Sequence, residues 1–212
     1  MEGLFRIGVF YDGSHFNYAQ NYFYGKGLGW LSFKPFHKFL EEYVRKHIQG
    51  DFDYKVVYAA WYQGLFTTAN SDEKHLKLDR QRHQDLMHAG IDAKFLPMAQ
   101  SSNMEKGIDV AMALDILEVG LSDIVDLAFL VTGDGDFVPL ARSLMKHSII
   151  VGLAFFEYEE DGRKSFANER LKDACSLAIN INSLETDREF KSNFKSLFKT
   201  HDKNIPSKKK VE

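Results

Sequence analysis

Four aspartates stand where the sequence suggests that chemistry could take place. Asp12 directly follows an apolar run at residues 7–11, and Asp134 and Asp136 follow a second run at residues 129–132. If both runs are buried parallel strands, they deliver the three carboxylates to the carboxyl edge of one sheet, where ligands bind in open α/β folds. These three acids are therefore candidates for a shared site.

The fourth aspartate, Asp109, lies in the first turn of a predicted helix. Asp115 lies six residues further on, about 120° around that helix, so its side chain should point in a different direction from that of Asp109. We expect Asp115 to lie behind the metal ligands or on the surface. The helix carries an apolar face, which we expect to pack on the protein, at Val110, Leu114, Leu117 and Leu121.

Two of the four acids also have a purely structural interpretation. Asp109 could simply stabilise its helix, because a carboxylate in the first turn of any helix interacts favourably with the helix macrodipole. Asp136 could be an N-cap, because residues 137–147 read as a helix with Pro139 in the first turn. Asp134 stands between two glycines and has less need of a structural role.

Carboxylates that meet at one edge of a sheet raise one another's pKa unless a cation compensates them. Mg²⁺ and Mn²⁺ are hard cations that prefer oxygen ligands. The sequence therefore predicts a site for one of these divalent metals at the carboxyl edge.

The elements that would hold these acids alternate along the chain. This alternation predicts an α/β fold with a central parallel sheet of about five strands flanked by helices. We expect helices at residues 72–89 and from Ser32, as N-cap, to residue 48 or 49. The predicted strands are apolar runs at residues 4–11, 54–61, 91–96, 126–132 and 149–156.

Composition favours one compact domain in a reducing compartment. A chain of 212 residues with 44% hydrophobic content can bury one substantial core. Cys175 is the only cysteine, which excludes an internal disulfide and a cysteine-rich zinc site. Without a secretory leader or an apolar run of membrane length, we expect a soluble, cytoplasmic protein with no membrane contact.

Charge is distributed unevenly between two predicted parts. Residues 186–212 carry eight Lys and Arg against four Asp and Glu, whereas the net charge of the whole chain is −3. We assign residues 1–184 to one domain and residues 185–212 to a C-terminal helix and basic tail. The acidic body argues against a general nucleic-acid coat but not against a metal-dependent nuclease.

Three blocks of this sequence resemble the signature blocks of the NYN domain family, which includes the LabA-like proteins. They are VFYDGS at residues 9–14, KGIDV at residues 106–110 and VTGDGDFVPL at residues 131–140. Their order and approximate spacing match the family, and the third block is the most specific. The resemblance covers about residues 5–180.

This resemblance implies a single PIN-like, Rossmann-like domain with metal-dependent endoribonuclease activity on RNA. The family positions that hold Mg²⁺ or Mn²⁺ and carry catalysis match Asp12, Asp109, Asp134 and Asp136. Thr132 matches a family serine or threonine near those acids, and the substrate-binding candidates are Lys106, Ser14, His15 and Thr132. Lys106 is expected to neutralise a phosphate.

The sequence departs from the family in two places. His15 stands where Asn is common, and His147-Ser148 where Gly is common. His15 could contact phosphate, or it could simply pack at the start of a helix, which is slightly favoured.

Two other functions compete with a ribonuclease. One is a PIN-like module that binds RNA or a protein without cutting; retention of all four aspartates weighs against it. The other is a phosphatase of the haloacid dehalogenase type, which needs a second Asp where Ser14 stands. The sequence leaves open the RNA substrate, the number of metal ions and whether the protein is a homo-oligomer.

Overall fold

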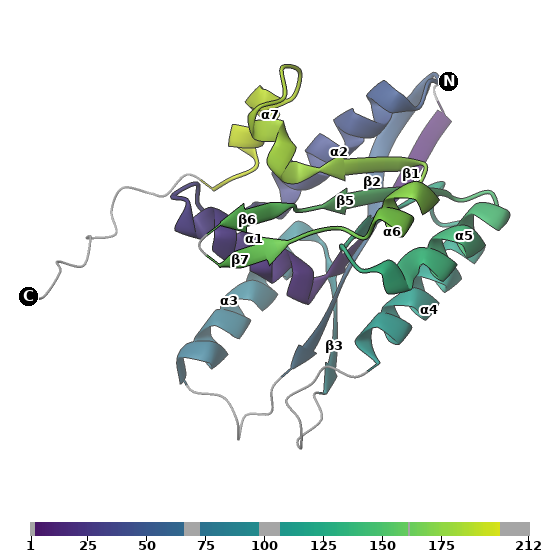
Figure 1. The fold of residues 1–212 in the computed structure, drawn as a ribbon. Helices are drawn as coiled ribbons and strands as arrows, with labels where there is room; N and C mark the ends of the chain where they lie inside the picture. Colours follow the sequence, from purple (N-terminus) through teal and green to yellow (C-terminus); the bar gives the residue numbers. More distant parts are fainter. Residues whose placement is uncertain (1–2, 66–72, 98–106, 161, 200–212) are drawn as a thin grey trace, which may run out of the picture.

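A six-stranded parallel sheet forms the centre of the computed structural model, which describes residues 3–65, 73–97, 107–160 and 162–199 (Figure 1). The strand order is β3-β2-β1-β4-β5-β8, and every pair of neighbours is parallel. The strands are β1 (Gly3–Asp12), β2 (Phe52–Leu65), β3 (Asp92–Pro97), β4 (Leu127–Val131), β5 (Ile150–Phe155) and β8 (Leu177–Asn180).

Helices cover both faces of this sheet, and a small antiparallel hairpin of β6 (Tyr158–Glu160) and β7 (Arg163–Ser165) lies beside α1 (Figure 1). The helices are α1 (Gly13–Gly25), α2 (Phe33–His47), α3 (Glu73–Ala89), α4 (Ile108–Leu121), α5 (Val138–Lys146), α6 (Glu169–Ala174) and α7 (Lys191–Ser196). The described residues also form the 3₁₀ turns η2 (Gly135–Phe137) and η3 (Ile181–Glu185).

The central strand β1 shows how the sequence builds two cores. Side chains alternate between the two faces of a strand. Ile7, Val9 and Tyr11 pack on one side with α1 and α2, whereas Phe10 packs on the other side with α4 and α5. Both faces of β1 are buried, and its residues 7–11 are accordingly apolar. The final residue, Asp12, lies at the carboxyl edge of the sheet.

The predicted parallel sheet is confirmed, and all five predicted strands are present. The sixth strand, β8, was not predicted, because its four residues at the edge of the sheet give too short a pattern. Ser32 is the N-cap residue of α2, as expected, but its side chain makes no capping hydrogen bond.

The predicted packing face of α4 is wrong. Val110 and Leu114 are each 63% exposed and Leu121 is 53% exposed. The buried face lies on the other side of the helix, at Ile108, Met112, Ile116 and Val119. Since α4 is apolar almost all round, two stripes fit the helical period, and only the contact with the sheet selects between them.

The C-terminal segment contributes to the main core. Phe190, Phe194, Leu197 and Phe198 are all buried in the same cluster as the β1 side chains. The division between residues 184 and 185 stays a prediction, and most of the predicted basic tail, residues 200–212, lies outside the described residues. None of the helices described here has the length and apolar character needed to cross a membrane.

Candidate metal-binding site

Asp12 ends β1 and begins α1. It is the N-cap of α1, and its Oδ1 accepts a hydrogen bond from the backbone N–H of His15 at 3.1 Å. Gly13 is required next, because a Cβ there would lie 2.7 Å from the carbonyl oxygen of Tyr62 and 2.8 Å from the ring of Trp61. The Asp-Gly pair thus turns the chain sharply and fixes the carboxylate at the edge of the sheet.

Thr132 connects Asp12 to the second predicted block. Its side chain is fully buried just beyond β4, the strand that pairs with β1. The Thr132 hydroxyl donates to Oδ2 of Asp12 at 3.1 Å and accepts from the backbone N–H of Asp134 at 3.3 Å. One hydroxyl therefore links the ends of two neighbouring strands, as the register of a parallel pair allows.

Asp134, rather than Asp136, is the capping residue of the turn that follows. Its Oδ1 accepts from the backbone N–H of Asp136 at 2.9 Å and opens η2. The capping role considered for Asp136 is therefore wrong, because η2 intervenes before α5, whose N-cap is Phe137. Both aspartates are exposed, and neither forms an ion pair with a described residue.

Asp109 is exposed in the first turn of α4, a helix that contacts η2. Lys106, the predicted phosphate ligand, lies outside the described residues. Asp115 accepts a hydrogen bond from the Tyr62 hydroxyl and pairs with Lys94 at 2.6 Å, so its carboxylate is already neutralised by a neighbouring cation.

His15 packs at the start of α1. Its ring lies 5.5 Å from that of Phe156, and its Nε2 is buried without a hydrogen-bond partner among the described residues. Burial lowers the pKa of His15 to about 4, an effect that the nearby Asp134 carboxylate only partly opposes. The ring is thus neutral at neutral pH and brings no positive charge. Ser14, the other candidate on this helix, is half-buried.

Asn168 supports the site but was not singled out from the sequence. Its backbone N–H donates to the carbonyl of Gly133 at 2.9 Å, and its side chain caps α6 by accepting from the N–H of Arg170. A Cβ at Gly135 would lie 2.5 Å from its Nδ2. Asn168 therefore packs against the Gly-Asp-Gly turn and fixes its position. In the sequence, an Asn before a helix with an acidic first turn is the signal that could have identified this residue.

The donor chemistry of this edge fits a hard divalent cation. Asp12, Asp134 and Asp136 offer only oxygen, and the last two open directly to solvent. Across the described residues, however, no three His, Cys, Asp or Glu side chains lie close enough to share one ion. The structure therefore does not bring the four predicted aspartates together as ligands of a single ion. One or two of these carboxylates could still hold Mg²⁺ if water and a substrate phosphate completed its coordination.

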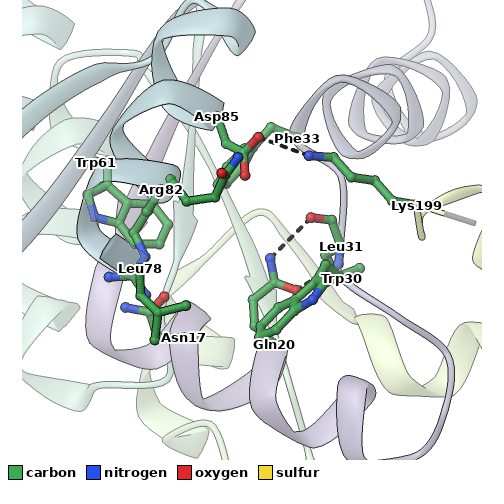
Figure 2. A pocket seen from close by; sticks show the side chains of 11 residues that line it. Asn17, Gln20, Trp30, Leu31, Phe33, Trp61, Leu78, Arg82, Asp85 and Lys199 are labelled. Atoms are coloured by element: carbon green, nitrogen blue, oxygen red, sulfur yellow. Dashed lines mark hydrogen bonds and ion pairs between the residues drawn. The ribbon is translucent and has the colours of Figure 1, made fainter. Parts of the chain in front are cut away.

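A separate pocket of about 310 Å³ lies between α1, α3 and the segment before α2 (Figure 2). Trp30, Trp61, Phe33 and Leu78 make much of its lining apolar. Its two cations are already paired, Arg82 with Asp79 at 3.3 Å and Lys199 with Asp85 at 3.0 Å. This pocket is therefore ill suited to a phosphate.

Comparison with known proteins agrees with this architecture. The model of the NYN domain family matches residues 6–182. A crystal structure of a protein of unknown function from Vibrio parahaemolyticus is similar, with a TM-score of 0.58 and 22% identity, over 85% of this chain and 95% of that one. None of the curated proteins matches the chain. The chain therefore belongs to the NYN domain family, whose members are generally PIN-like nucleases.

Proposed function

We propose that this protein is a metal-dependent endoribonuclease that cuts RNA phosphodiester bonds at the edge formed by Asp12, Asp109, Asp134 and Asp136. The observation that carries the proposal is the Thr132 hydroxyl, which joins the carboxylate of Asp12 to the backbone of Asp134. Two neighbouring strands that are far apart in the sequence thus end at aspartates linked through one hydroxyl, at the edge where α/β folds bind ligands.

Mg²⁺ or Mn²⁺ bound there would polarise a phosphate and lower the pKa of a water molecule for in-line attack. The residues of the chain supply position and charge. Asp12 and Asp134 would hold the ion, and Asp136 and Asp109 add negative charge from the neighbouring turn and helix. Since His15 is neutral and buried, it is poorly suited to transfer a proton at neutral pH.

The family supports a divalent metal and an RNA substrate, because NYN domains are usually nucleases of the PIN-like type. The alternative is a module that binds RNA or protein without cutting it. The observation that favours this alternative is that no three acids among the described residues meet at one point. A substrate phosphate that completes the metal site would reconcile that geometry with catalysis.

Incubation of the purified protein with labelled RNA and single-stranded DNA, in Mn²⁺, Mg²⁺ or EDTA, tests the proposal. We expect cleavage of RNA in either metal and none in EDTA. Cleavage that persists in EDTA would refute the dependence on metal. RNA binding without cleavage in any metal would favour the non-catalytic module.

A further inference from the structure

A groove of about 740 Å³ runs between the outer face of α1 and the β6–β7 hairpin, next to the candidate metal site. His15 lines its inner end, and the neighbouring Asp12 caps α1, so the groove begins where that helix leaves the sheet. Figure 1 shows the hairpin lying alongside α1. The groove also includes Tyr18, Tyr24, Arg163 and Lys164.

A ring contact and an ion pair hold the hairpin against α1 and the residue that follows it. The rings of Tyr22 and Tyr158 stack at 3.9 Å with an interplanar angle of 12°. Lys26, just beyond α1, forms an ion pair with Glu160 on β6. The hairpin is therefore held against the helix, and its basic residues lie at a fixed place beside the candidate site.

The cations of this groove differ from those of the pocket in Figure 2. Arg163 and Lys164 are exposed, and neither forms an ion pair with a described residue, although Glu159 and Glu160 oppose them across the hairpin. A Cβ at Gly25 would lie 3.5 Å from Nη1 of Arg163, so this guanidinium reaches toward the end of α1. Two unpaired cations at one groove are suited to phosphate.

Aromatic side chains accompany these cations. Tyr18 is 69% exposed and lines the groove, as does Tyr24, whose ring stacks on that of Trp30 at 4.8 Å. Phe166 follows directly after β7, is 57% exposed, and its carbonyl lies 2.9 Å from where a Cβ of Gly133 would be. The segment that carries the cations thus continues to the glycine turn of the candidate site. Exposed rings alternating with cations are typical of single-strand binding surfaces.

We infer that this groove binds the single-stranded part of an RNA substrate, with Arg163 and Lys164 contacting phosphates and Tyr18 stacking on a base. The inference rests on the proposed function for the identity of the nucleic acid. A duplex fits the groove less well, because its bases are stacked within the helix and present no free face to Tyr18.

Binding without cleavage is measured by fluorescence anisotropy, with a labelled single strand of about 12 nucleotides in EDTA. The double variant Arg163→Ala, Lys164→Ala is compared with Lys34→Ala, Lys38→Ala, which removes the same charge from a cavity beside α7. Loss of two phosphate contacts should flatten the slope of log affinity against log salt by about 1.4. The control should keep the slope of the parent; equal slopes in the two double variants would overturn the inference.

The stacking step is tested with Tyr18→Leu against Tyr18→Phe. Because Tyr18 is mostly exposed, neither change should affect folding. Phe keeps the ring and should bind like the parent, whereas Leu should weaken binding about fivefold or more. Equal affinity of the two variants, or parent binding to a duplex as tight as to the single strand, would contradict the inference.

A cleavage assay in Mn²⁺ separates the two proposals. If the parent cuts no RNA but loses affinity through the groove variants, the proposed nuclease function fails and the groove inference stands. If the parent cuts RNA and the groove variants bind like the control, the groove inference fails alone.

Discussion

Asp134 offers the sharpest test, because the structure gives it a capping role that can be separated from metal binding. Its Oδ1 accepts from the N–H of Asp136 at 2.9 Å. Asparagine caps about as well as aspartate, so Asp134→Asn should keep this bond while removing the charge that a hard cation needs. Asp134→Ala removes both the cap and the charge.

The expected stabilities follow from these contacts. Without metal, Asp134→Ala should lose about 1 kcal/mol of unfolding free energy, which lowers the melting temperature by about 2–4 °C. Asp134→Asn should match the parent or exceed it slightly, because it relieves repulsion among neighbouring carboxylates. Mn²⁺ at about 100 times its dissociation constant should raise the melting temperature of the parent by about 5–10 °C.

Both variants should lose RNA cleavage and most of the Mn²⁺-dependent rise in melting temperature. Asp187→Asn is the matched control, because Asp187 also caps a turn, accepting from the N–H groups of Glu189 and Phe190 at 2.7 and 2.9 Å. This control should keep both cleavage and the metal effect. Cleavage by Asp134→Asn at the rate of the parent, with an intact Mn²⁺ shift, would refute the assignment of Asp134 as a metal ligand.

Three further changes test the surroundings of the site. Thr132→Val removes the hydroxyl that joins the two strand ends, so its rate of RNA cleavage should fall at least tenfold, whereas Thr132→Ser keeps the hydroxyl and should cleave like the parent. Equal cleavage rates for the two variants would show that the hydroxyl does not contribute to cleavage. Gly13→Ala should cost more than about 2 kcal/mol of unfolding free energy, because the new Cβ would overlap Trp61; urea unfolding checks this, and an unchanged midpoint would contradict it. Burial lowers the pKa of His37 to about 4, so stability should fall as pH drops from about 6.5 toward 4, where the unfolded state binds a proton that the folded state does not. His37→Phe should reduce the loss between pH 7 and pH 5 by up to about 2 kcal/mol, and an unchanged loss would show that this ring does not titrate as described.

The parts of the fold that the sequence predicts well are those with burial on both faces. The apolar runs of β1 and β4 end in acids and glycines. The sequence therefore predicts both that these strands form and that they end at the carboxyl edge of the sheet. The β6–β7 hairpin is different, because each of its strands has three residues and carries mostly charged side chains. It gives no apolar period, and it is held in place by contacts with distant parts of the chain, the stacking of Tyr158 on Tyr22 and the ion pair of Glu160 with Lys26.

For the candidate site, the sequence predicts a set of residues but not the contacts among them. Block order identified Asp12, Asp134 and Thr132, whereas the exchange of capping role between Asp134 and Asp136 depended on a 3₁₀ turn of three residues. Such a turn leaves no periodic signal, because one turn is shorter than any repeat. The supporting role of Asn168 depends on tertiary packing across more than thirty residues of chain.

The same aspartate can both cap a turn and bind a metal ion. The structural interpretation of these acids as caps and their functional interpretation as metal ligands are therefore compatible. Each carboxylate oxygen has two acceptor positions, so the hydrogen bonds that Asp12 accepts from His15 and Thr132 do not by themselves prevent its carboxylate from binding a cation. The backbone N–H of Asp136 fixes Asp134 in the same way. These bonds restrict the side chains before any metal arrives, which reduces the conformational entropy lost on binding. A cap at each strand end is therefore what a preorganised carboxylate site at this edge would require.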